Sequence, residues 1–197
     1  MLRCCDHMSV IGLKILLVSG LTALSIDHVR AGQDWQAANA ATIRLKPSAF
    51  PELPATVRRY LERRGCEVPQ AVSDKAPHNV VRGRFTSSTQ TDIAVLCSRA
   101  RLSAVLLFRG GTTSSVAELA QRSDEAFLQV IDARGGVGYS RALGVATPSY
   151  IQQHYAFYGG PKPPPLDHDG INDIFVEKAS IVWYWYRGRW LQLQGAD

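Results

Sequence analysis

The chain lacks an excess of charge of either sign and, beyond its first 31 residues, any apolar run long enough to cross a membrane. Its 22 Lys and Arg residues are nearly balanced by 17 Asp and Glu residues. Together with 46% hydrophobic residues, this balance excludes a disordered acidic or basic tail protein. A length of 197 residues suits one folded domain with a short appendage.

Familiar catalytic and nucleic-acid-binding signatures are also missing. The chain contains no Gly-x-Ser-x-Gly, no His-Glu-x-x-His and no cysteine–histidine nucleophile pattern. Residues 134–138 (RGGVG) follow a candidate strand, but no helix-forming segment and no P-loop lysine come after them, so we interpret them as a turn. The basic residues form no stripe interleaved with aromatics, and we therefore expect no nucleic-acid partner.

The N-terminal segment predicts export. Ile15–Ile26 is uncharged, mostly apolar and preceded by Lys14. As a helix this segment would span about 18 Å, which is short of a bilayer core of about 30 Å. Because Val29 and Ala31 satisfy the small-residue rule for cleavage, we predict a signal peptide over 1–31 and a secreted or periplasmic location. An N-terminal membrane anchor is the alternative.

Removal of this segment would leave a chain with two cysteines and no transmembrane segment. It would also take away three basic and two acidic residues, which changes the net charge from +5 to +4. Cys66 and Cys97 are then an even pair in an exported chain, which favours a disulfide. Closing a loop of about 30 residues would stabilise the fold by roughly 3–4 kcal/mol. The alternative, a two-cysteine zinc site, has no histidine at ligand spacing.

The mature chain divides into a leader and one domain. Residues 32–49 are polar and alanine-rich without a clear period, and we expect a flexible leader there. Residues 50–197 then form a single β-rich domain. It begins with a helix between Pro54 and Gly65, because proline suits the first helical turn and glycine the end. The four arginines of this helix indicate either a solvated face or a binding patch.

Short Val-, Leu- and Phe-rich segments predict an antiparallel meander, with strands at 79–85, 91–98 and 102–109. Alternation places Cys97 inward, where a bridge to the helix end would hold the helix on the sheet. Residues 179–194 predict a C-terminal hairpin around Arg187 and Gly188. The fold class is therefore mainly β (α+β by strict count), with an antiparallel meander, a C-terminal hairpin and one N-terminal helix, and it is not a closed propeller.

One loop carries the spacing of a metal site. Residues 167–173 contain Asp167, Asp169 and Asp173 around a glycine, and such alternate carboxylates can converge on a hard cation. We therefore consider calcium, with Ile171 contributing its backbone carbonyl. Two alternatives remain: an Asx-type turn in which the carboxylates cap backbone N–H groups, and an acid–base site formed by Asp167, His168 and Asp169.

The same loop, with the segment IFVEKASIVW that follows, resembles the calcium loop of integrin-alpha-type FG-GAP and VCBS repeats. Residues 83–98 have a similar pattern, in which a strand end is followed by a polar loop, an aspartate and an apolar strand. Arg84, Phe85 and Asp92 occupy the corresponding places. The resemblance implies hairpins inside a small domain, because two hairpins cannot close a propeller of at least four blades. Pro165 stands at the first ligand position and has no side-chain oxygen. The segments DHDG, EKAS and GAD are also similar to small exported bacterial proteins of unassigned function.

The C-terminal hairpin offers a candidate recognition surface. Trp183 and Trp185 share one face, and Trp190 lies on the returning strand. These rings could contact a glycan or an envelope protein, or could pack between layers. The sequence thus favours an exported binding or structural domain with possible calcium stabilisation. The alternatives are a small hydrolase using Asp167, His168 and Asp169, and an inhibitor of an external enzyme.

Overall fold

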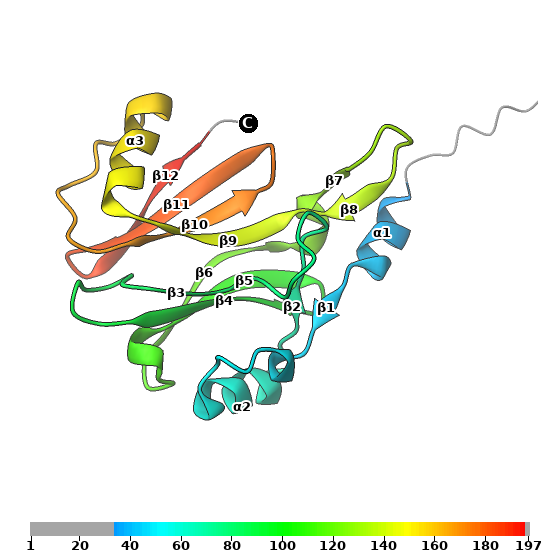
Figure 1. Cartoon of the computed structure of the whole chain (residues 1–197), viewed down its shortest axis with the longest axis horizontal. Helices are drawn as coiled ribbons and strands as arrows, with labels where there is room; N and C mark the ends of the chain where they lie inside the picture. Colours follow the sequence, from blue (N-terminus) through cyan, green and yellow to red (C-terminus); the bar gives the residue numbers. More distant parts are fainter. Residues whose placement is uncertain (1–33, 196–197) are drawn as a thin grey trace, which may run out of the picture. The chain divides into compact units, whose positions relative to one another are not determined.

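Two four-stranded antiparallel sheets lie face to face, and a helix covers the outer side of each (Figure 1). The structure is a computed structural model that describes residues 34–195, all of which belong to one compact unit. The first sheet has the strand order β3-β4-β5-β6, and the second has the order β12-β11-β10-β9. Within residues 34–195 the strands form no closed barrel or propeller, so the predicted mainly β, antiparallel class is confirmed.

The elements of the first sheet are β3 (Val80–Gly83), β4 (Asp92–Arg99), β5 (Leu102–Phe108) and β6 (Val116–Ser123). Those of the second are β9 (Arg141–Ala146), β10 (Gly170–Phe175), β11 (Ala179–Tyr186) and β12 (Arg189–Gln194). The helices are α1 (Trp35–Ala41), α2 (Ala55–Arg63) and α3 (Pro148–Tyr158). There are also two short strand pairs: β1 (Arg44–Leu45) pairs with β2 (Val68–Pro69), and β7 (Leu128–Val130) pairs with β8 (Val137–Tyr139). The fold is completed by three short turns, η1 (Pro47–Ala49), η2 (Arg109–Gly111) and η3 (Asp124–Phe127).

Strand alternation gives the first sheet two apolar faces. Ile93, Val95 and Cys97 of β4 point to the side where α2 buries Val57 and Leu61. Ala94 and Leu96 point the other way, into the core between the two sheets. Both faces of β4 are therefore buried, which explains its continuous apolar sequence.

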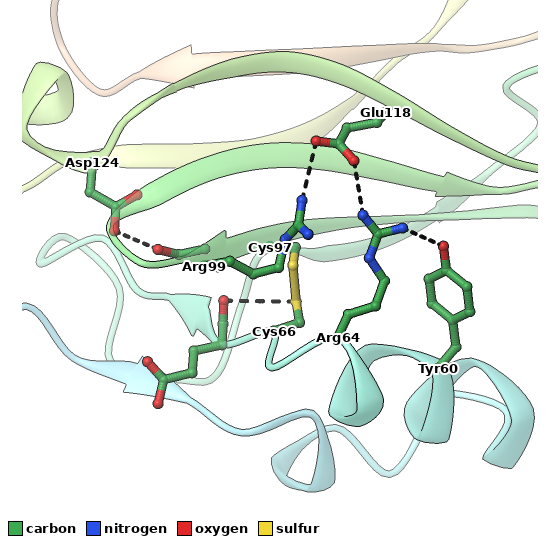
Figure 2. The surroundings of a disulfide bond; sticks show 9 residues. Tyr60, Arg64, Cys66, Cys97, Arg99, Glu118 and Asp124 are labelled. Atoms are coloured by element: carbon green, nitrogen blue, oxygen red, sulfur yellow. Dashed lines mark hydrogen bonds and ion pairs between the residues drawn. A yellow bond between two sulfur atoms is a disulfide. The ribbon is translucent and has the colours of Figure 1, made fainter.

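The disulfide joins Cys66, just after α2, to Cys97 of β4 (Figure 2). It therefore ties the end of the helix to the sheet, as the sequence predicted. Beside it, Glu118 of β6 accepts from Arg64 at the end of α2 and from Arg99 of β4 (Figure 2). This ion-pair group is one-third exposed on each partner, and such pairs contribute little to stability.

The second sheet is larger than the predicted hairpin. Residues 170–175 form a separate strand, β10, which pairs with β9 and β11. The segment IFVEKASIVW is divided between β10 and β11, and Glu177 takes a positive φ of 62° in the turn that joins them. α3 covers the outer face of this sheet, with Ile151 packed against a cluster containing Val182, Tyr184 and Leu193.

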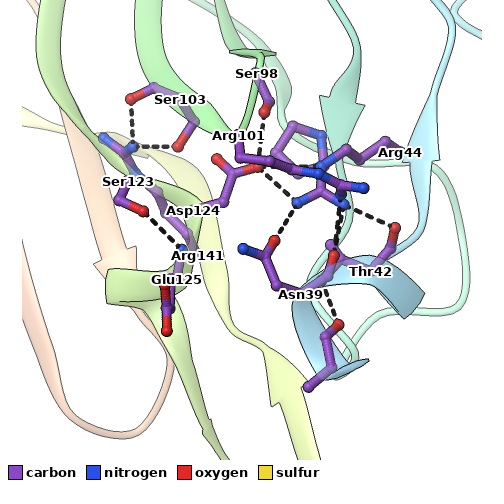
Figure 3. Close-up of polar contacts among 12 residues, drawn as sticks. Asn39, Thr42, Arg44, Ser98, Arg101, Ser103, Ser123, Asp124, Glu125 and Arg141 are labelled. Atoms are coloured by element: carbon purple, nitrogen blue, oxygen red, sulfur yellow. Dashed lines mark hydrogen bonds and ion pairs between the residues drawn. The ribbon is translucent and has the colours of Figure 1, made fainter. Parts of the chain in front are cut away.

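The predicted flexible leader over 32–49 was wrong for residues 35–49, which form α1, β1 and η1. An interaction distant in sequence holds them: Arg44 donates to the fully buried carboxylate of Asp124, at 3.1 Å from Nε and 2.7 Å from Nη2 (Figure 3). Ser98 donates to the same carboxylate oxygen. The predicted signal peptide over 1–31 lies outside the described residues.

Candidate functional site

The loop at 167–173 lies against the loop at 84–88. Asp169 accepts from the backbone N–H of Arg84 at 2.9 Å, and its own N–H donates to the Arg84 carbonyl at 2.8 Å. Asp167 accepts from the Ser88 hydroxyl at 2.8 Å, and this hydrogen bond lowers the pKa of the Asp167 carboxyl. These carboxylates therefore join one loop to the other.

Asp173 faces a different part of the molecule. Its two oxygens accept from Nε and Nη2 of Arg141, each at 2.8 Å, in the layer between the sheets. The other guanidinium donors reach the Ser103 carbonyl and hydroxyl and the Ala120 carbonyl (Figure 3 shows Arg141 beside Ser103). Ala120 has a φ of 55° at an irregularity in the β5–β6 pairing, so Arg141 satisfies a carbonyl at a distorted place in the ladder.

The three predicted calcium ligands thus have separate partners. Asp167 and Asp169 bond to the 84–88 loop, and Asp173 bonds to Arg141. In the part of the chain that the structure describes, no group of three or more His, Cys, Asp or Glu side chains could hold a metal ion. Calcium binding, including the backbone contribution of Ile171, stays a prediction. The arrangement matches the capping alternative for Asp169, which accepts from a backbone N–H.

Among residues 34–195, the side chains of the acid–base alternative are not hydrogen-bonded to one another either. His168 is buried, and its Nδ1 lies 3.1 Å from the carbonyl oxygen of Asp169. No hydrogen bond within residues 34–195 joins its ring to the Asp167 or Asp169 carboxylate. The hydrolase hypothesis also stays a prediction.

The tryptophans of the hairpin lie on the inner face of the second sheet, toward the first. Trp185 is directly opposite Trp190, and Trp183 is opposite Gln192. All three indole rings are half-buried: Trp183 and Trp190 pack against the inter-sheet core, and the Trp185 ring lies 5.5 Å from that of Trp190. Each of the three tryptophans is therefore partly exposed.

Two glutamines extend this row along β12. Gln192 and Gln194 are exposed, and register places them opposite Trp183 and Ile181, on the same face. We name Trp183, Trp185, Trp190, Gln192 and Gln194 the tryptophan strip. Sequence reasoning missed the two glutamines, although the alternation in RWLQLQ places them on the face of Trp190.

An arginine from the first sheet borders each end of the strip. The Arg109 guanidinium, in η2, lies 4.1 Å from the centre of the Trp185 ring, a cation–π geometry. Arg122, near the end of β6, lines a cavity of about 220 Å³ that begins where the strip ends, at Ile181 and Gln194. Neither arginine stands out in the sequence, because only the packing of the two sheets brings them to the hairpin.

Several polar atoms near the strip are buried without partners among residues 34–195. They are the indole Nε1 atoms of Trp183 and Trp190 and the Nε atom of Arg109. Unsatisfied buried donors are costly. Two of these donors belong to the hairpin, and the third belongs to η2 beside it.

No family model, no curated protein and no solved structure matches the chain. No helix within residues 34–195 is long and apolar enough to span a bilayer. The functional argument therefore rests on the geometry of the tryptophan strip.

Proposed function

We propose that this protein is an exported glycan-binding domain and that the tryptophan strip is its binding surface. The observation that carries the proposal is the row of half-buried indoles with exposed glutamine amides beside them on one sheet face. Sugar rings present an apolar C–H face, which suits an indole, and hydroxyl edges, which suit amides that both donate and accept.

The rigidity of the strip supports binding with little ordering cost. Its residues lie on two paired strands, and two of its indoles are already packed against the core. Preorganised rings lose little side-chain freedom when a ligand stacks on them. The strip is also a narrow row at the edge strand β12 rather than a broad face, and a stable protein–protein interface needs about 800 Å² per partner. These two features favour a glycan over an envelope protein.

Export is part of the proposal. The apolar segment Ile15–Ile26 and the small residues before Gly32 support a cleaved signal peptide, and the Cys66–Cys97 disulfide fits an oxidising compartment. We propose a secreted or periplasmic location. N-terminal sequencing of protein recovered outside the cytoplasm should find a chain that begins at Gly32. Recovery of the whole chain in the cytoplasm would contradict this part.

Retention on insoluble polysaccharides tests the binding role. The mature protein should be retained by at least one member of a panel of envelope and extracellular polysaccharides. Trp185→Ala should weaken that binding by more than about tenfold, because a tryptophan contact that dominates an interface costs about 2 kcal/mol or more to remove. Phe157→Ala, which removes an 80% exposed aromatic ring on α3, is the matched control and should bind normally. Equal retention of the wild type and both variants would exclude the tryptophan strip as the binding surface.

A further inference from the structure

The tryptophan strip ends in a cavity between the two sheets. This end pocket has a volume of about 220 Å³. Its lining includes Arg122 of β6, Phe127 of η3, Asp173 and Phe175 of β10, Ile181 of β11 and Gln194 of β12. Ile181 and Gln194 form the cross-strand pair next to Trp183 and Gln192, so a chain lying on the strip would lead into the pocket.

Arg122 is the uncompensated charge of the end pocket. It lies opposite Ser103 in the β5–β6 register, on the sheet face that points toward the second sheet. It is exposed, and none of the ion pairs formed within residues 34–195 includes it. A free guanidinium offers a planar pair of donors that matches a carboxylate.

The acidic residue in the pocket does not cancel this charge. Asp173 is held by Arg141 through two hydrogen bonds of 2.8 Å, so these two side chains form a neutral pair. A second cation lies near the wall, since the Lys178 ammonium is 5.0 Å from the centre of the Phe175 ring. The pocket therefore favours an anionic group.

The walls define the rest of the ligand. Phe127 and Phe175 provide aromatic surface, and Gln194 provides an amide at the strip side. The volume is below the range of about 300–1,000 Å³ that is usual for drug-sized ligands, so it suits one ring. One ring with an apolar face, hydroxyls and one anionic group is the chemistry of a uronic acid residue.

We infer that the end pocket binds a uronic acid residue of the glycan and that Arg122 pairs with its carboxylate. This inference rests on the proposed function, because it assigns the class of sugar that the tryptophan strip presents to the pocket. It makes the protein selective for acidic over neutral polysaccharide at a defined residue, rather than through its overall charge.

Polygalacturonate and its methyl ester, which share one sugar backbone and differ in charge, test the inference by calorimetry. The wild-type mature protein should bind the acid form about tenfold or more tightly than the ester, because Arg122 adds charge-assisted hydrogen bonds. Arg122→Gln should bring the two affinities to within about threefold, while Arg122→Lys should keep a partial preference. Arg59→Gln removes the same charge from an exposed position on α2 and should keep the full preference.

The outcomes separate this inference from the proposed function. Equal affinity for the two polymers, or an unchanged preference in Arg122→Gln, overturns the role of the end pocket. The binding role of the tryptophan strip is then still tested by Trp185→Ala. If Arg59→Gln also loses the preference for the acid form, that preference comes from the overall charge of the protein, and the inference is overturned. If neither polymer binds, the inference falls, and the polysaccharide panel alone decides on the strip.

Discussion

Individual charged residues of this protein are used to hold distant segments together. Asp173 and Arg141 are 32 positions apart and form a buried pair that also supports the distorted β5–β6 ladder. Arg44 and Asp124 are 80 positions apart, and their ion pair holds β1 against η3, next to the end of β6. The sequence of a loop rich in aspartate therefore predicts a cation site. It does not show which arginine will form an ion pair with each carboxylate.

The Arg141–Asp173 pair should be essential for stability. Asp173→Asn leaves a fully buried guanidinium without its counter-charge, and breaking such a pair costs about 3–5 kcal/mol. Glu118→Gln removes the charge of a one-third exposed carboxylate and should cost less than about 1 kcal/mol. Urea unfolding of both variants checks this difference. A loss below 1 kcal/mol for Asp173→Asn would show that Arg141 finds other partners.

At the scale of elements, α2 and α3 are attached to their sheets by different interactions. α2 uses apolar contacts and the disulfide at its end. α3 uses apolar contacts of Ile151. The buried His154 ring lies between those of Tyr150 and Tyr158 of the same helix, at 5.8 and 4.8 Å. The disulfide of Cys66 could be predicted from the sequence, because Cys97 is the only other cysteine in the predicted mature chain. The role of His154 could not, since a lone histidine in a short helix carries no pattern.

Removal of the disulfide should loosen α2. Cys66→Ala with Cys97→Ala releases a loop closed over a sequence separation of 31, which should lower the free energy of unfolding by about 3–4 kcal/mol. The same loss should follow from reduction of the wild-type protein, whereas reductant should not affect the double variant. Equal urea midpoints for the oxidised and reduced wild type would contradict the predicted contribution.

His154 should make the stability pH-dependent. The side chain is only 4% exposed, and its burial lowers the pKa of the imidazole below the usual value of about 6.5. As the pH falls below about 6.5 the unfolded chain binds a proton before the folded one, so the free energy of unfolding decreases. His154→Gln cannot titrate and should lose less stability between pH 7.5 and 5.5.

Urea unfolding at these two pH values measures the effect. Above pH 7.5 the imidazole is neutral in both states, so the wild type and His154→Gln should show the same pH dependence there. The same loss on acidification in both proteins would show that His154 is not responsible.

At the scale of the whole molecule, the proposed site depends on two stacked four-stranded sheets, which place edge strands β6 and β12 on the same side. The meander, the helix at 55–63 and the aromatic hairpin follow from local alternation and capping, and the sequence predicted them. The ordered segment 35–49 and the arginines at both ends of the tryptophan strip depend on contacts between distant segments, which local patterns do not encode. Trp185 could be named in advance, whereas Arg122 could not.

Titration of tryptophan fluorescence tests the binding role of the strip most directly. A soluble oligosaccharide from a retained polysaccharide should cause a saturable change in emission, because a sugar that contacts the half-buried Trp185 removes water from it. Trp185→Phe should lose most of this change while keeping its fold by circular dichroism. A saturable change of undiminished size in Trp185→Phe, or no change with any polysaccharide, would contradict a glycan-binding tryptophan strip.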